Sequence, residues 1–188
     1  MAKCLICNAR KGKRKCIAAD GFVCSQCCGK TRSSDQCAGC SYFKDEKSLR
    51  NYRKVPHYAV SEMAKGDVFQ DRANVIESAL CGFDYEQGQC LDDRTAAGII
   101  ELLLDNYHFG DEQIASSKPL VERGFIAVDQ AIKEDLSSQR PEEIAKLLGS
   151  VHRSITRHDE GRRAYLEFVH DYVGVRVGSG ARAMRNLL

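Results

Sequence analysis

The fold of this chain is decided by residues 4–40, which read CLICNARKGKRKCIAADGFVCSQCCGKTRSSDQCAGC. This stretch holds eight of the ten cysteines: Cys4, Cys7, Cys16, Cys24, Cys27, Cys28, Cys37 and Cys40. Three pairs have the spacing C-x2-C, which lets both sulfurs of a pair face one metal ion. Zn²⁺ accepts four thiolates in a tetrahedron, so eight cysteines suit two ions. The sequence therefore predicts a cysteine-rich module with two zinc ions per chain.

The order of the cysteines suggests how they divide between the two ions. We expect the first ion to be bound by Cys4, Cys7, Cys24 and Cys27. We expect the second ion to be bound by Cys16, Cys28, Cys37 and Cys40. Tight turns beside the ligands are expected at two residues that tolerate a left-handed backbone, Asn8 and Gly29. Because four thiolates leave no position for a substrate water, both sites are expected to be structural.

Other uses of these cysteines fit the sequence less well than zinc does. Disulfides need an oxidising compartment, and the N-terminal residues show no apolar stretch typical of a signal peptide. The ferredoxin spacings C-x2-C-x2-C-x3-C and C-x4-C-x2-C are absent. A redox C-x-x-C is expected beside a βαβ pattern, and none is visible. Disulfides, an iron–sulfur cluster and redox use stay as the alternatives.

The residues around the fourth and fifth cysteines resemble a known kind of zinc finger. Residues 22–27, Phe-Val-Cys-Ser-Gln-Cys, are similar to a stretch of the two-zinc, treble-clef-like fingers of the HIT and MYND type. Those fingers have a second C-x2-C where this chain has only Cys16, and they end in His and Cys where this chain has Cys37 and Cys40. The resemblance covers residues 4–40. It implies two interleaved zinc sites in an adaptor module of the kind that mostly binds other proteins.

Charge is divided unevenly along the chain. Residues 1–54 contain 13 Lys and Arg against 4 Asp and Glu, whereas residues 55–188 contain 15 against 22. Two tetrathiolate zinc ions would lower the N-terminal balance to about +5. Many of the N-terminal cations belong to a basic loop between Cys7 and Cys16 or follow Cys28: Arg10, Lys11, Lys13, Arg14, Lys15, Lys30 and Arg32.

This basic loop, residues 10–15, has two interpretations. Its cations could contact phosphates, which makes nucleic acid a candidate partner. Alternatively the loop is an ordinary charged surface that partly neutralises the thiolate sites. Few aromatic side chains accompany the cations, which argues against sequence-specific recognition of single strands.

The rest of the chain predicts an all-α region. Residues 1–45 are too few to bury a large apolar core, so metal is expected to hold them together. Residues 46–57 are expected to be a linker or short helix ended by Pro56. Residues 58–188 are expected to form an α-helical bundle. The expected fold is therefore a small metal-stabilised zinc module followed by an all-α helical bundle.

Five amphipathic helices are predicted within this bundle, with no convincing strand pattern after Asp67. The first runs from about Asp67 to near Gly82. The second is capped by Asp92 or Asp93 and stops near Gly110. Because the second is apolar on more than one face, we expect it to be central. Two more begin at Pro119 and Pro141. The last runs from about Asp159 to Val173, and Ala181–Leu188 are expected to form a short basic helix.

Two groups of residues in the helical region could form a metal site or a binding site. Glu167-x-x-His170 has the spacing of a carboxylate-bridged di-iron motif, but the required second copy is missing, and Asp105-x-x-His108 is only a near match. Four arginines near one helix junction are expected to be a solvated face or a site for phosphate or an acidic partner: Arg153, Arg157, Arg162 and Arg163.

The sequence as a whole favours a non-catalytic, cytoplasmic zinc-binding interaction protein. The zinc module would be a docking surface, and the helical domain would bind a protein partner or form a homo-oligomer. A nucleic-acid-binding protein that uses the basic loop is the first alternative, and a metalloenzyme with a site in the helical bundle is the second. No apolar run approaches the roughly 18–20 residues that span a bilayer, so no membrane association is expected.

Overall fold

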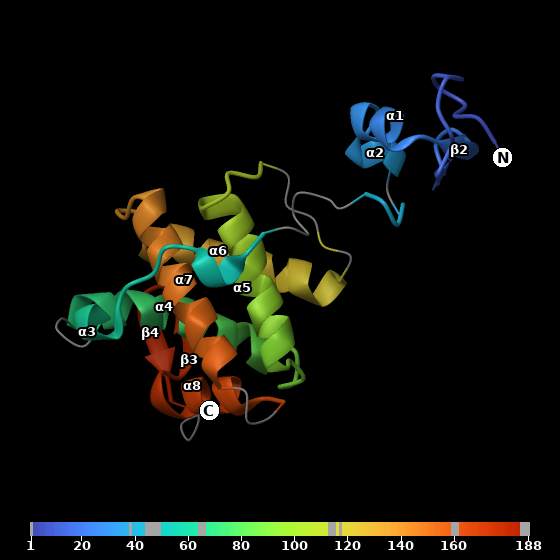
Figure 1. The fold of residues 1–188 in the computed structure, drawn as a ribbon. Coiled ribbons are helices and arrows are strands. Elements are labelled where there is room, and N and C mark those ends of the chain that lie inside the picture. The colour runs from blue at the N-terminus through green and yellow to red at the C-terminus, as the bar shows by residue number, and fades with distance from the viewer. Residues whose placement is uncertain are drawn as a thin grey trace. The chain divides into compact units, whose positions relative to one another are not determined.

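The computed structural model describes residues 2–37, 39–43, 50–63, 67–112, 116, 118–158 and 162–184. The chain divides into two units, Met1–Arg50 and Asn51–Leu188 (Figure 1). We call them the N-terminal unit and the helical unit, and each is described by itself. Within the described residues, no helix is both long and apolar enough to cross a bilayer.

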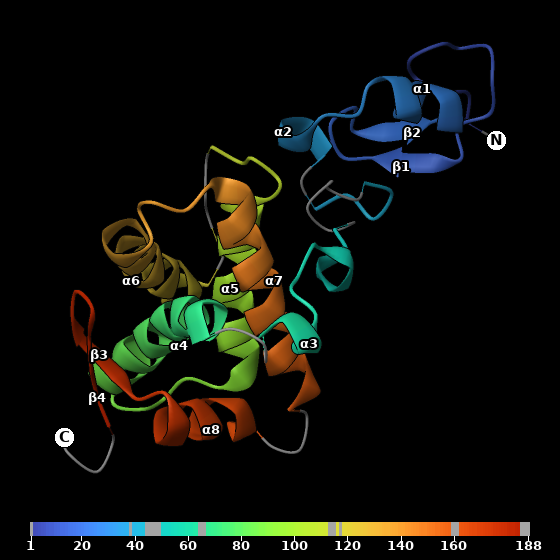
Figure 2. The same ribbon diagram turned by 90° about the vertical axis from the view of Figure 1, so that its left-hand side faces the viewer.

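The N-terminal unit is built from a short β-hairpin and two short helices (Figure 2). Strand β1 (Arg14–Cys16) pairs antiparallel with β2 (Gly21–Val23), so that Lys15 lies opposite Phe22. Helix α1 (Ser25–Lys30) follows β2, and helix α2 (Ser34–Cys37) comes next. The buried apolar cluster of this unit consists of Cys4, Val23 and Cys24, with other cysteines and Ala19 packed against it. A core this small cannot hold some fifty residues together, so the cysteines must supply most of the cohesion.

The helical unit contains most of the secondary structure. Its elements, in chain order, are the 3₁₀ turn η2 (Tyr52–Lys54), α3 (Val60–Met63), α4 (Asp67–Glu86), α5 (Asp93–Tyr107), α6 (Pro119–Asp135), α7 (Pro141–Arg157), α8 (Ala164–Tyr172), β3 (Val175–Gly178) and β4 (Ala181–Ala183). Helix α5 packs against α6, α7 and α8, and α4 packs against α6, α7 and α8. Four large side chains of α5 are fully buried: Ile99, Ile100, Leu103 and Leu104. Their burial agrees with the predicted central place of this helix.

The starts of three helices agree with their sequence signals. Pro119 and Pro141 occupy the first turns of α6 and α7, where the missing N–H of proline costs no helical hydrogen bond. Asp92 caps α5, and its Oδ1 accepts a hydrogen bond of 2.8 Å from the backbone N–H of Thr95.

The end of α4 was predicted wrongly. The helix continues past Gly82 to Glu86. The glycine serves packing instead, because a Cβ at this position would lie 3.2 Å from the backbone oxygen of Arg176 in β3. Gly82 therefore lets a strand cross closely over α4.

The prediction that no strand follows Asp67 was also wrong. β3 and β4 form an antiparallel hairpin, with Val175 opposite Ala183, where a short basic helix was expected from residue 181. The hairpin is fastened to α6 because Arg176 donates to Glu134 Oε2 at 2.6 Å and to Asp135 Oδ2 at 3.0 Å. Residues 185–188 of the expected helix, 46–49 of the expected linker and 159–161 of the last expected helix lie outside the described residues.

A buried ionic network joins α4 to α8 and to the segment before it. Asp84 is fully buried and accepts from Arg163 Nη2 at 2.8 Å, from His170 Nε2 at 2.9 Å and from the backbone N–H of Leu91 at 3.0 Å. Burial opposes ionisation of this carboxyl, but the bonds from His170, Arg163 and Leu91 outweigh it and lower the pKa of Asp84 to about 2. The network explains why Arg163 is not part of a surface cluster.

Replacing Asp84 by Asn should destabilise the helical unit by about 3–5 kcal/mol, because Arg163 would lose its buried counter-ion. The folded-state pKa of Asp84 lies below its ordinary 3.8, so its contribution is present above about pH 4 and is lost as the pH falls toward 2. Urea unfolding followed by far-ultraviolet circular dichroism at several pH values measures both effects. Glu86→Gln, an exposed position on the same helix, is the control and should change stability by less than about 0.5 kcal/mol. Equal effects of the two substitutions would contradict the role of Asp84.

Candidate metal centre

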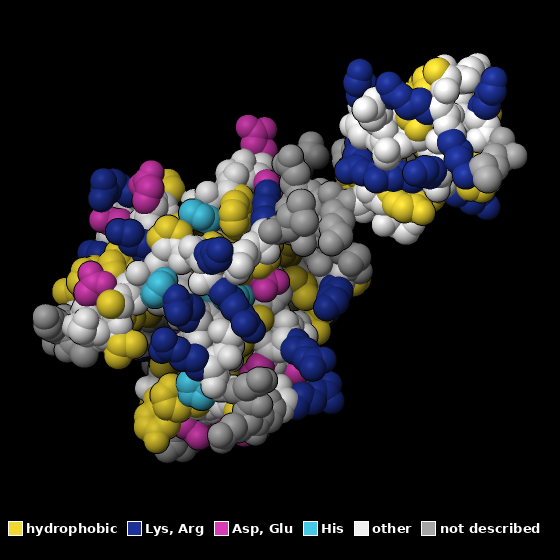
Figure 3. All heavy atoms as spheres, in the orientation of Figure 1, with side chains coloured by type: hydrophobic (Ala, Val, Ile, Leu, Met, Phe, Trp, Pro, Cys, Tyr) yellow, Lys and Arg dark blue, Asp and Glu magenta, His cyan; other side chains and the backbone are white. Residues whose placement is uncertain are grey.

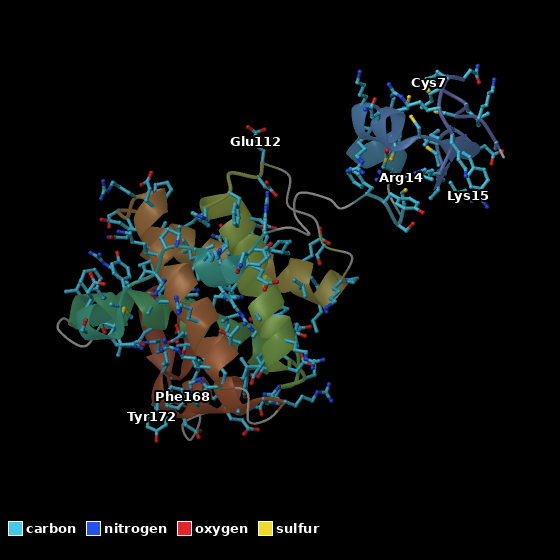
Figure 4. The ribbon with its side chains drawn as sticks, viewed as in Figure 1. Cys7, Arg14, Lys15, Glu112, Phe168 and Tyr172 are labelled. Carbon is cyan, nitrogen blue, oxygen red and sulfur yellow. The ribbon has the colours of Figure 1, made fainter. Side chains whose placement is uncertain are left out.

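Four of the predicted ligands meet in the N-terminal unit. The sulfur atoms of Cys4, Cys7, Cys24 and Cys27 all lie within 4.8 Å of one another, and those of Cys7 and Cys24 are 4.0 Å apart. A tetrahedral ion with metal–sulfur bonds of about 2.3 Å places its sulfurs about 3.8 Å apart. Figure 4 shows sulfur atoms gathered near Cys7. The donor set therefore fits a thiolate-favouring metal ion.

Local backbone structure holds these sulfurs in place. Between Cys4 and Cys7 the chain makes a turn closed by Asn8 N–H on the Cys4 carbonyl at 2.9 Å, and Asn8 has a φ of 50°. This left-handed turn at Asn8 was predicted, whereas Gly29 lies inside α1. Cys24 is the N-cap of α1, and its sulfur accepts from the backbone N–H of Cys27 at 3.4 Å. In both pairs, Cys4 with Cys7 and Cys24 with Cys27, the backbone turns after the first cysteine. This turn brings the sulfur of the second cysteine close to that of the first.

The pKa shifts of three of these thiols are compatible with a site for a cation. Burial disfavours the Cys4 thiolate, but backbone N–H groups, chiefly that of Cys24, outweigh it and lower the pKa of Cys4 to about 6. The backbone N–H of Cys27 lowers the pKa of Cys24, while the neighbouring sulfurs, Cys24 first, raise the pKa of Cys27 to about 12. The thiols of Cys4 and Cys24 therefore ionise more readily than that of Cys27, and a divalent cation bound between them would favour the thiolate form of all three.

The second predicted set is arranged less tightly. Its four members line one cavity of about 220 Å³ in the N-terminal unit: Cys16 from β1, Cys28 from α1, Cys37 from α2 and Cys40. Among the described residues, the first set is the one group of three or more potential ligands whose atoms lie within 4.8 Å of one another. The second set shares a cavity but does not meet this criterion, so its metal ion stays a prediction.

Arg14 lies at this second cavity. Its guanidinium is 3.5 Å from the sulfur of Cys28 and lies over the ring of Tyr42 at 5.2 Å from the centroid. This contact lowers the pKa of the Cys28 thiol. Sequence reasoning offered this kind of role for residues 10–15 as one of two interpretations, but it treated them as one loop and did not single out Arg14. In the β1 strand, alternate side chains point to opposite faces, which turns Arg14 toward Cys28 and leaves Lys13 and Lys15 exposed.

The other cations of the basic loop also differ in their surroundings. Arg10 donates to the side-chain oxygen of Gln26 in α1. Lys11, Lys30 and Arg32 are exposed. Figure 3 shows Lys and Arg side chains spread over the visible face of this unit. Arg10 and Arg14 are therefore engaged within the unit, and Arg32 also hydrogen-bonds to the Cys28 thiol and lowers its pKa. Lys11, Lys13 and Lys15 are exposed.

The helical unit offers no comparable ligand group among its described residues. His170 is buried on Asp84, whereas Glu167, three residues earlier, is exposed, so this pair does not face one ion. Asp105 is buried and accepts from the Tyr52 hydroxyl at 2.8 Å. Cys81 is buried, and Cys90 is exposed.

Comparison of the chain with protein-family models, curated proteins and solved structures gave no match. The assignment of a role therefore rests on the residues and their geometry.

Substituting Cys24→Ser should remove the bound metal ion from the first site and unfold the N-terminal unit, because metal binding supplies the folding energy of so small a unit. Metal content by elemental analysis and the visible spectrum of the Co²⁺-loaded protein report the site. Far-ultraviolet helicity should stay largely intact, since the helical unit has its own core. Cys90→Ser, an exposed thiol outside the cluster, is the matched control and should keep the metal. Loss of most helicity in Cys24→Ser, or unchanged metal content, would contradict this prediction.

Proposed function

We propose that this chain is a non-catalytic zinc-binding interaction protein. The zinc module is its docking surface, and the helical part, which we take as a helical bundle, binds a protein partner or self-associates. The observation that carries the proposal is the four-sulfur group, whose atoms lie within 4.8 Å of one another. An ion with four sulfur ligands has no open position for a substrate, so its use is to hold a surface in shape.

Zinc is the metal that this donor set supports best, and we propose two ions per chain. Tetrahedral sets of four sulfurs bind zinc or iron, and the ferredoxin spacings are absent from the sequence. The shared cavity of Cys16, Cys28, Cys37 and Cys40 supports a second ion. Arg14 would then act as a donor to a ligand sulfur, as groups around metal sites commonly do.

The surface of the N-terminal unit supports a docking role. Several large apolar side chains are exposed on it, including Leu5 at 55%, Ile17 at 62% and Phe22 at 45%. Leu5 and Phe22 are neighbours, because the backbone N–H of Leu5 donates to the Phe22 carbonyl at 3.1 Å. Exposed apolar groups held on a rigid module are typical of protein-binding surfaces.

The docking role predicts that the double substitution Leu5→Ser and Phe22→Ser weakens partner binding while leaving the metal in place, since neither residue is a ligand. Affinity capture with the full chain, quantified by mass spectrometry and paired with elemental analysis, measures both. Ile126→Ser removes an equally exposed apolar group from α6 and is the control. Identical partner recovery by the wild type, the double variant and Cys24→Ser would refute docking through the zinc module.

Nucleic-acid binding is the second candidate function, and the exposed lysines of the basic loop favour it. Lys11, Lys13 and Lys15 are all exposed, whereas Arg10 and Arg14 are engaged within the unit. Fewer cations are thus free for phosphates than the sequence suggested.

We expect the full chain to bind a labelled DNA duplex only weakly, with an affinity that falls steeply as salt is raised. Replacing Lys11, Lys13 and Lys15 by Glu should abolish this binding without releasing metal. Fluorescence anisotropy at several salt concentrations measures it, and Lys133→Glu on α6 of the helical unit is the control. Submicromolar, salt-sensitive binding by the wild type would make nucleic-acid binding the leading function.

A further inference from the structure

A groove on the helical unit has the shape and chemistry of a binding site. Its volume is about 620 Å³, and it is lined by residues of α3, α4, α7 and α8 and of the segment before α3. We call it the α3–α8 groove. Two regions that are far apart in the sequence, 57–77 and 150–173, thus contribute to one hollow, and none of the proposed zinc ligands lies in it.

The groove has buried apolar side chains at its base and exposed aromatic side chains at its rim. Ala73 and Val151 are buried at the floor, whereas Val60 on the α3 side is 67% exposed. On the α8 side, Phe168 and Tyr172 are 43% and 73% exposed, and their ring centroids are 4.7 Å apart. Figure 3 shows hydrophobic side chains at this edge of the unit, where Figure 4 labels both residues.

These aromatic rings are held in place by a third ring. His158 stacks on Phe168 with a centroid distance of 5.3 Å and an interplanar angle of 28°. His158 is itself held by a hydrogen bond of 2.9 Å between its Nδ1 and the Ser154 carbonyl. Pre-ordered aromatic groups lose little entropy on binding, and such residues often dominate the affinity of an interface.

Positive charge lines the α7 side of the groove. Arg153 and Arg157 are four residues apart on one helix face. Arg153 is bonded to the ring of His57 at 2.9 Å, and among the described residues neither arginine forms an ion pair with a carboxylate. Arg162 lines a different cavity, and Arg163 forms an ion pair with Asp84. The four arginines that were considered as one cluster therefore lie in different surroundings.

The carboxylates near the groove do not neutralise these arginines. Glu77 is the one acidic residue in its lining, and its Oε1 accepts from the Tyr165 hydroxyl at 2.9 Å, while burial raises the pKa of its carboxyl. Near Tyr58, Glu62 caps the backbone N–H of Ala59, and Glu143 pairs with Arg140. Among the described residues, the groove therefore presents an apolar hollow beside two cations that form no ion pair with a carboxylate.

We infer that the α3–α8 groove binds an acidic segment of a partner protein, with a bulky apolar side chain inserted between Val60 and Tyr172 and carboxylates placed against Arg153 and Arg157. A helical segment with two acidic residues four positions apart matches the spacing of the arginines. This inference rests on the proposed protein-binding role of the helical part.

A peptide fits this groove better than a nucleic acid does. Residues 51–188 contain 22 Asp and Glu against 17 Lys and Arg, so the net charge of the unit disfavours a long polyanion. Two arginines can neutralise two carboxylates, but they cannot neutralise a continuous row of phosphates. The deep apolar floor also matches a side chain such as Leu or Phe rather than a sugar-phosphate backbone.

The test uses the full chain and a fluorescein-labelled helical peptide of about 16 residues that carries two Glu four positions apart beside Leu and Phe. Two further peptides are its controls: one has Lys in place of Glu, and one has Ser in place of Leu and Phe. Fluorescence anisotropy should show binding of the acidic apolar peptide, with both control peptides weaker by about tenfold. Equal binding of the three peptides, or no binding, would overturn the inference.

Protein variants locate the binding to the groove. Arg157→Glu should weaken binding of the acidic peptide by about tenfold and improve binding of the lysine peptide, since the charges then match again. Tyr172→Ser should weaken binding of the acidic apolar peptide, because Tyr172 is proposed to contact its apolar side chain. Arg123→Glu, an exposed position on α6, should leave peptide binding unchanged. Arg157→Glu behaving like Arg123→Glu would overturn the inference. The inference would also be overturned if a single-stranded oligonucleotide displaced the labelled peptide at a lower concentration than the unlabelled peptide does.

Failure of this inference can be told apart from failure of the proposed function. Cys24→Ser should bind the peptide as the wild type does, because the groove lies within the helical unit. If the peptide does not bind but partner recovery still depends on Leu5 and Phe22, only the groove is refuted.

Discussion

We propose that attraction between a cation and four crowded sulfurs is the interaction on which the N-terminal unit depends. Cys4, Cys7, Cys24 and Cys27 bring their sulfurs within 4.8 Å, a spacing at which thiolates repel one another unless an ion lies between them. Val23 is the one buried aliphatic side chain in the core cluster beside them. With a metal ion bound, the unit would have metal–sulfur bonds in place of a large apolar core, as small domains commonly do. The helical unit has the opposite solution: a continuous apolar core in which the charged network around Asp84 fixes how α8 lies on α4.

This division of labour bears on function. If a metal ion occupies the four-sulfur site, its four ligands leave no open position for a substrate, and the proposed role of the N-terminal unit is then carried by its surface. That surface combines exposed apolar residues such as Leu5 and Phe22 with exposed lysines. The α3–α8 groove has the same combination, with Tyr172 beside Arg157. Both surfaces therefore suit acidic partners with apolar side chains, which is the physical basis for regarding the protein as an interaction protein.

The sequence predicted those features whose signals are local. Cysteine spacing identified the four sulfurs that meet, and Pro119, Pro141 and Asp92 marked the starts of three helices. It did not predict features that depend on packing between distant segments. Gly82 was taken for a helix end because only β3, almost a hundred residues later, explains it. Likewise, the groove joins two regions that are far apart in the sequence, and the different fates of Arg157 and Arg163 follow from which helix each one faces.

Zinc K-edge X-ray absorption of the purified full chain, together with a zinc count per chain, tests the central claim most directly. The predicted result is about two zinc ions per chain, each with four sulfur neighbours at about 2.3 Å and no nitrogen or oxygen neighbour. One zinc ion with the same surroundings would confirm the first site and refute the second. Iron in place of zinc, nitrogen or oxygen ligands, or a metal-free protein with disulfides among the N-terminal cysteines would contradict the claim.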